Sequence, residues 1–94
     1  MNYNYMLCGR KIDENLLQNY GFVKDGNKYV FRTDLQNGLY VEIKISQTQL
    51  AVDVFDAIFN KKYAAFSNGH SGSAIRAQVR EIVENILNAC CAAQ

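Results

Sequence analysis

Several residue types that mark familiar protein classes are scarce or missing in this sequence. It has no proline and no tryptophan, one histidine and three cysteines among 94 residues. No apolar stretch reaches the length needed to cross a membrane. The N-terminal stretch MNYNYMLCGRK also lacks the apolar run of a signal peptide. We therefore expect no membrane partner and no export.

The cysteines do not read as a disulfide framework. Their number is odd, and Cys90 and Cys91 are neighbours that pair only through a strained small ring. We therefore expect reduced thiols and a cytoplasmic location. A zinc site built from Cys8, His70, Cys90 and Cys91 is conceivable, but the spacing gives no indication of one. We expect no metal and no cofactor.

Charge of one sign is also missing. Ten Lys and Arg balance nine Asp and Glu, which gives a net charge of +1 with the signs interspersed. A protein that depends on nucleic acid or anionic lipid usually carries a one-sided basic field. Hydrophobic residues instead make up 49% of the chain, and charged residues 20%. That balance predicts one folded domain over residues 1–94.

A short helix is predicted near the N-terminus, between Asp13 and Gly21. Asp13 is a good N-cap residue, and Ile12 can pack on Leu17 as a hydrophobic staple. Gly21 supplies the left-handed residue that ends the helix. The helix is about two turns long and needs tertiary packing to persist. Its apolar stripe would consist of Leu16, Leu17 and Tyr20.

A run of antiparallel strands follows the short helix. Asp25-Gly26 and Asn37-Gly38 are turn signals between apolar-rich arms. The stretches LYVEIKIS and QLAVDVFD alternate apolar and polar residues, as half-buried strands do. The turn at residues 56–60 leads to a shorter final strand, KYAAF. The buried set of the two alternating strands would be Val41, Ile43, Ile45, Leu50, Val52 and Val54.

The strongest helical pattern lies near the C-terminus, after the loop NGHSGS. Its apolar stripe, with 3.6-residue periodicity, consists of Ile75, Val79, Ile82, Val83, Ile86, Leu87 and Cys90. About eighteen residues at 1.5 Å each give a rod of about 27 Å, enough to cross a four- or five-stranded sheet. We predict an α+β fold: a four- to five-stranded antiparallel meander, with a short N-terminal helix and a long C-terminal helix packed on one face.

The glycine-containing loop before the long helix raises the question of an anion site. Gly69, His70, Gly72, Ser73 and Arg76 could supply backbone donors and a cation. The pattern matches neither phosphate-binding glycine motif, and a short antiparallel strand precedes it. We therefore predict that the loop only begins the helix, with Ser71 or Ser73 as N-cap. The anion site remains an alternative hypothesis.

The sequence gives no support for an enzyme. His70 has no Cys, Asp or Glu nearby at ligand spacing, and a lone loop histidine is usually a surface residue. Asp53 and Asp56 have the wrong period for two carboxylates on one strand face, and turn chemistry explains Asp56 better. No nucleophile, base and orienting group can be assembled.

One candidate binding surface follows from the alternation of the strands. If the buried set faces the helices, the other face of the sheet carries Arg32, Tyr40, Lys44 and Phe55. Such a mixture of aromatic and cationic residues can contact another protein or stack nucleic-acid bases, although an ordinary mixed surface also explains it. The leading hypothesis is a non-enzymatic interaction domain that contacts a partner domain or a second copy. The alternative is a nucleic-acid-binding module that uses the same face, which the small net charge disfavours.

The second half of the sequence resembles a known module. It has a V-x-V-[YF]-D strand at Val52 to Asp56, Tyr63, Gly72, the pair Val79-Arg80, and Ile86-Leu87 followed by Cys90. These features are similar to the accessory module of extended MmcQ/YjbR-like proteins. The resemblance covers the last half of the chain well and the first half loosely.

The resemblance implies a cytoplasmic bacterial protein of poorly defined function. In extended members the module adjoins a second α/β domain that carries a DNA-binding label. The present chain departs from that arrangement, since it stops at Gln94 without a glycine cap. It is expected either to stand alone or to be a module cut from a longer protein. The resemblance carries over no catalytic residue.

Overall fold

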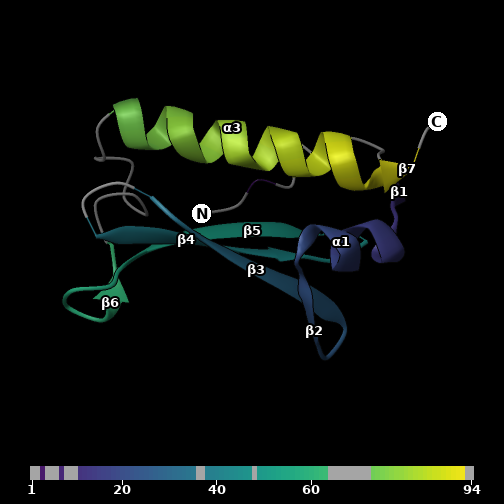
Figure 1. Cartoon of the computed structure of the whole chain (residues 1–94), viewed down its shortest axis with the longest axis horizontal. Helices are drawn as coiled ribbons and strands as arrows, with labels where there is room; N and C mark the ends of the chain where they lie inside the picture. The colour runs from purple at the N-terminus through teal and green to yellow at the C-terminus, as the bar shows by residue number, and fades with distance from the viewer. Residues whose placement is uncertain are drawn as a thin grey trace.

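Five strands form an antiparallel sheet that carries a long helix on one face in a computed structural model of the chain (Figure 1). The structure describes residues 3, 7, 11–35, 38–47, 49–63 and 73–92. The fold is α+β, as predicted. The elements in chain order are β1 (Lys11–Ile12), α1 (Glu14–Tyr20), β2 (Val23–Asp25), β3 (Lys28–Asp34), β4 (Leu39–Ile45), β5 (Leu50–Asp56), β6 (Lys61–Lys62), α3 (Ser73–Cys90) and β7 (Cys91–Ala92).

The main sheet is a meander. Its strand order is β2-β3-β4-β5-β6, and each strand is antiparallel to the next. The first turn lies one residue later than predicted, because Asp25 still pairs with Lys28 and leaves Gly26 and Asn27 as the loop. Gly26 has φ of 65°, which a glycine adopts without steric cost. Of the predicted second turn, Gly38 is described and Asn37 lies outside the described residues.

The last strand of the sheet begins one residue earlier than predicted. The Asp56 carboxylate accepts hydrogen bonds from the N–H groups of Ile58 (2.9 Å) and Phe59 (3.2 Å), so the turn at residues 56–60 is confirmed. Strand β6 is described over Lys61–Lys62, and the Tyr63 N–H donates to the Val54 carbonyl at 2.7 Å. Residues 64–66 of the predicted strand KYAAF lie outside the described residues.

Helix α1 begins and ends as predicted. The Asp13 side chain accepts from the N–H groups of Asn15 (2.9 Å) and Leu16 (3.3 Å), and Gly21, with φ of 123°, ends the helix. The predicted apolar stripe is wrong in part, since only Leu17 is buried. Leu16 and Tyr20 are 37% and 38% exposed, although the Tyr20 ring packs on the Phe31 ring with centroids 5.5 Å apart.

Helix α3 covers the predicted face of the sheet (Figure 1). Its buried residues are Ile75, Val79, Val83, Ile86, Leu87 and Cys90, with Ile82 partly buried. They join the inward side chains of β4 and β5, among which Val41, Ile43, Val52 and Val54 are fully buried. Burial of one such side chain contributes about 1.5–3 kcal/mol. This packing places the predicted buried set under α3.

A second, two-stranded ladder joins the two ends of the described chain. Lys11 pairs with Ala92 and Ile12 with Cys91, and the Asp13 N–H donates to the Cys90 carbonyl at 2.9 Å. No sequence pattern predicts these short strands. The ladder fixes the start of α1 beside the end of α3.

Replacing the N-cap of α1 tests how far this short helix depends on its first turn. Asp13→Ala removes the acceptor for two backbone N–H groups, and we expect a loss of about 1 kcal/mol in the free energy of unfolding. The matched control Asp13→Asn keeps an acceptor and should remain close to the wild type. Urea denaturation measures both. Equal losses in the two variants would contradict the capping role.

Candidate functional site: the open face of the sheet

The register of the strands defines a sheet face on the side opposite α3. Arg32 pairs with Glu42, Tyr40 with Phe55, and Lys44 with Ala51, so these side chains share one side of the sheet. Neither α1 nor α3 lies on this side (Figure 1). We call it the open face; its residues are Val23, Asp25, Lys28, Val30, Arg32, Asp34, Tyr40, Glu42, Lys44, Ala51, Asp53, Phe55 and Lys62.

All four residues predicted from the alternation lie on the open face. Tyr40 and Phe55 are neighbours on β4 and β5, and their rings stack with centroids 5.3 Å apart and an interplanar angle of 14°. Both side chains are half-buried. The structure therefore brings Arg32, Tyr40, Lys44 and Phe55 together on one surface, while their role in binding stays a prediction.

A buried carboxylate organises the cations of the open face. Only 7% of the Glu42 side chain is exposed. Its oxygens lie 2.7 Å from Arg32 Nε and 3.3 Å from Lys44 Nζ. On the neighbouring strands, Lys62 Nζ lies 3.7 Å from Asp53 Oδ1. Three cations of this face thus have carboxylate partners within the chain, which reduces the positive potential that they present to solvent.

The turn between β5 and β6, which follows Phe55 in the chain, adds two exposed apolar side chains. Ile58 is 73% exposed and Phe59 69%. Ile58 packs over Gly38, where a β-carbon would lie 2.9 Å from Ile58 Cδ1. The turn and β6 lie on the side of the sheet away from α3 (Figure 1). We call Tyr40, Phe55, Ile58 and Phe59 the apolar corner.

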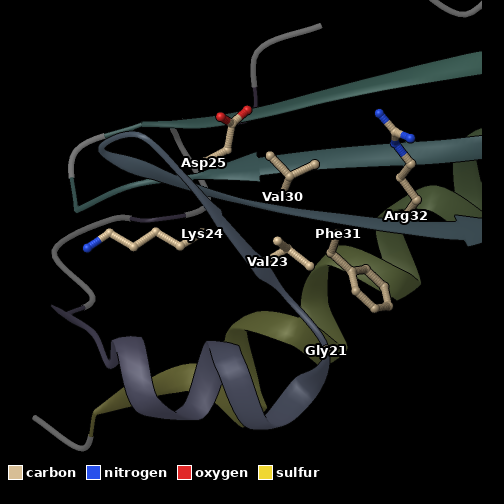
Figure 2. A pocket seen from close by; sticks show the side chains of 7 residues that line it. All are labelled: Gly21, Val23, Lys24, Asp25, Val30, Phe31 and Arg32. Atoms are coloured by element: carbon tan, nitrogen blue, oxygen red, sulfur yellow. The ribbon is translucent and has the colours of Figure 1, made fainter.

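Two shallow hollows lie beside residues 30–34 of strand β3. The larger, about 510 Å³, lies where β2 begins, and Figure 2 shows Asp25, Val30 and Arg32 on the side away from the helices, with Phe31 on the helix side. The second, about 400 Å³, is lined by Arg32, Thr33, Asp34 and Tyr40. Lining residues of the larger hollow are Gly21, Val23, Lys24, Asp25, Val30, Phe31 and Arg32.

The alternative anion site falls mostly outside the described part of the chain. Gly69, His70, Gly72 and the candidate cap Ser71 are among residues 64–72, which are not described. Ser73 begins α3, and Arg76 is an exposed residue of that helix. The anion site therefore stays a hypothesis.

The thiols near the chain end are placed by the ladder of β1 and β7. Cys90 is fully buried and its Sγ donates to the Leu16 carbonyl at 3.6 Å. Burial, with smaller contributions from Cys91 and Asp13, raises the pKa of the Cys90 thiol above its ordinary value of 9.0. Cys8 and His70 lie outside the described residues. Within the described ranges, no three His, Cys, Asp or Glu side chains group as metal ligands.

The binding residues proposed from the sequence did not include Glu42, Asp53, Ile58 or Phe59. Glu42 and Asp53 are the acids that partner its cations, and their pairing depends on the strand register. Ile58 and Phe59 could have been recognised from the sequence, because two large apolar residues inside a polar turn have no core to pack against.

No helix in the described part of the chain has the length and apolar character of a membrane span.

The buried carboxylate predicts an asymmetry between its partners. The double variant Arg32→Met with Lys44→Met leaves Glu42 buried without its cations, and we expect a loss of about 2 kcal/mol in the free energy of unfolding. Glu42→Gln should cost about 1 kcal/mol or less, because the exposed cations return to water. Urea denaturation measures both. Arg80→Met breaks the exposed Arg80–Glu84 pair and is the control, with an expected change within about 0.5 kcal/mol. A larger loss for Glu42→Gln than for the double variant would contradict the argument.

The burial of Cys90 predicts slow reaction with alkylating reagents. The thiolate is the reactive form, and burial lowers both its population at neutral pH and its access to the reagent. Iodoacetamide should therefore modify the half-buried Cys91 before Cys90 in the folded protein. Fragment mass spectra resolve the two positions, and the same reaction in concentrated urea is the control. Equal rates for Cys90 in the folded and unfolded chain would contradict the prediction.

Comparison with known proteins finds no relative of this chain. No family model, no curated protein and no solved structure matches the chain. The resemblance to the MmcQ/YjbR-like module therefore stays a prediction.

Proposed function

We propose that this chain is an interaction domain that docks the open face of its sheet onto another protein. The observation that carries the proposal is the apolar corner. Ile58 and Phe59 are large apolar side chains exposed by about seven tenths, in the turn that follows Phe55 of the stacked pair. Exposed apolar side chains that gather at one end of a folded domain commonly mark contact sites.

The apolar corner has the properties of an anchor in a protein interface. Binding energy at such interfaces is concentrated in a few large side chains that enter pockets on the partner. The Asp56 carboxylate holds the turn through two hydrogen bonds, so Ile58 and Phe59 lose little backbone freedom on binding. Lys61 Nζ also lies over the Phe59 ring, 5.7 Å from its centroid.

The charges beside the corner indicate what the partner presents. Lys61 and Lys62 are exposed next to Phe59, and Lys62 is paired only loosely with Asp53 at 3.7 Å. A complementary partner therefore has an apolar hollow bordered by acidic side chains. Acidic groups at such a border contribute to specificity and to the rate of association.

Nucleic acid fits the same face less well. Arg32 and Lys44 already share the Glu42 carboxylate, and Lys62 lies beside Asp53. Binding of phosphates depends on cations that are available to replace counterions. The open face carries the acids Asp25, Asp34, Glu42 and Asp53 against the bases Lys28, Arg32, Lys44 and Lys62, so its charges balance. This balance favours a protein surface.

The cellular context is part of the proposal. The reduced, buried Cys90 thiol is consistent with the cytoplasm, where thiols stay reduced. In the extended bacterial proteins that the second half of the sequence resembles, an α/β domain adjoins the module. A domain of that kind, joined or separate, is the partner class that we propose for the apolar corner.

A comparison of three matched baits tests the proposal. The double variant Ile58→Ser with Phe59→Ser removes both anchors, whereas Val23→Ser removes an apolar side chain of similar exposure (68%) at the other end of the open face. We expect one protein to be retained by the wild type and by Val23→Ser but not by the double variant. Calorimetry with that purified protein should give a dissociation constant about tenfold or more weaker for the double variant.

Two results would contradict the proposal. One is equal retention of every bound protein by all three baits, although circular dichroism shows them folded. The other is binding of a single- or double-stranded oligonucleotide at low salt that weakens steeply as salt is added, which is the behaviour of the nucleic-acid alternative.

A further inference from the structure

Strand β3 has an unpaired outer edge in the described part of the chain. Its neighbour β2 pairs only Val23–Asp25 with β3 residues 28–30, whereas β3 continues to Asp34. The other edge of β3 pairs with β4 along its length. Residues 31–34 therefore form an edge segment with one side open.

The backbone groups on this edge belong to Arg32 and Asp34. The Leu35 N–H donates to the Leu39 carbonyl at 2.8 Å, so Leu35 directs its backbone groups toward the β4 side. Successive residues of a strand direct these groups to opposite sides. Arg32 and Asp34 thus present their N–H and C=O groups outward. The hairpin between β2 and β3 gives the same result. Lys28 flanks its two-residue loop and directs its backbone N–H and C=O groups toward β2, and Arg32 and Asp34 are two and three alternations further along β3.

The space beside this edge is hollow because the chain leaves the sheet at Gly21. With φ of 123°, Gly21 ends α1 and its N–H bonds back to the carbonyls of Leu17 and Gln18. Among the residues that the structure describes, no strand continues beyond Val23 alongside Arg32. The hollow of about 510 Å³ lies at this point (Figure 2), and the hollow of about 400 Å³ borders Thr33 and Asp34.

We propose that two copies of this chain pair through these β3 edges as antiparallel strands. A two-fold axis perpendicular to the sheet would pass beside Thr33. Arg32 of one copy would then lie opposite Asp34 of the second copy, and the symmetric pair would lie on the other side of the axis. In this register the outward N–H and C=O groups of both pairs face one another, as in the hydrogen-bonded positions of an antiparallel ladder.

The side chains at the edge match in this register. Arg32 and Asp34 both lie on the open face, so each guanidinium would stand directly opposite a carboxylate of the second copy. Arg32 Nε faces Glu42 at 2.7 Å, and the guanidinium has further N–H donors on its Nη atoms. The hollow beside Arg32 offers room for the incoming Asp34.

The neighbouring registers oppose pairing. A shift in one direction places Arg32 opposite Arg32 of the second copy, and a shift in the other places Asp34 opposite Asp34. Like charges directly across a ladder are destabilising. Charged residues on an edge commonly prevent indiscriminate strand pairing. Here their order along β3 also selects one register of a self-complementary pair.

This dimer goes beyond the proposed docking function and uses the backbone edge of β3. Ile58 and Phe59 lie in the turn between β5 and β6, whereas Tyr40 of the apolar corner pairs with Asp34 across β3 and β4. A variant at Asp34 should therefore weaken the dimer, while Ile58 and Phe59 at the β5–β6 turn keep their contact with a captured protein. If the docking proposal fails, the Asp34 variants still test the dimer. If the dimer proposal fails, the Ile58 and Phe59 variant still tests the docking.

Light scattering coupled to size-exclusion chromatography tests the dimer on the whole chain. We expect the wild type to shift from monomer to dimer between about 10 µM and about 1 mM, a range typical of a small interface. Asp34→Pro removes an outward N–H donor, and Asp34→Lys places a cation opposite Arg32 of the second copy. Both should raise the dimer dissociation constant about tenfold or more, because each change acts at two symmetric pairs. Asp25→Lys makes the same charge change on β2 and should dimerise like the wild type.

Hydrogen exchange of single amides gives a second readout that does not depend on any variant. The Arg32 and Asp34 amides should exchange more slowly as the protein concentration rises. Circular dichroism of the protein should stay the same over that range of concentrations. Three results would overturn the proposal: a wild type that remains monomeric at about 1 mM, a dimer that Asp34→Pro and Asp34→Lys leave intact, or exchange at both amides that is independent of concentration. A dimer lost only in the Ile58 and Phe59 variant would place the contact on the open face instead.

Discussion

The packing of α3 on β4 and β5 is the interaction on which the rest of the structure depends. The helix contributes Val79 and Val83 and the sheet Val41 and Val52, and each of these side chains is at most 1% exposed. The other side of the same strands carries charged residues at alternating positions, so it offers the helix no comparable apolar surface. The helix therefore has one stable side. That choice leaves the open face, with its aromatic pair and ion pairs, available for contact.

Much of this arrangement could be predicted from the sequence because it follows from two periods. Alternation along β4 and β5 assigns Tyr40, Lys44 and Phe55 to the side away from the core, and the 3.6-residue period gives α3 its buried stripe. Features that depend on register could not be predicted. The burial of Glu42 requires Arg32 and Lys44 to meet it across and along strands. The ladder of β1 and β7 pairs residues that lie far apart in the sequence, which no local pattern indicates.

The ion pairs of the open face fix geometry more than they add stability. Glu42 is nearly buried, whereas the Arg32 side chain remains 65% exposed. The attraction in such a pair is largely offset by the cost of removing the carboxylate from water. What the pair achieves is a fixed guanidinium position at the edge of the sheet, since a bonded Nε limits the rotamers of Arg32. A charge held in place discriminates between partner registers better than one on a mobile side chain.

The open face and the β3 edge meet at Arg32. The proposed protein contact and the proposed dimer contact therefore have a defined geometric relation. A two-fold axis perpendicular to the sheet keeps both α3 helices on one side and both open faces on the other. From β6 of one copy to β6 of the second there would be seven interstrand spacings of about 4.8 Å, or about 34 Å along the extended sheet. The apolar corners would then stand at opposite ends of one surface. A partner with two suitably spaced hollows would bind both corners, and the second contact would form at a high effective concentration. Weak contacts at each corner would in this way combine into a specific complex.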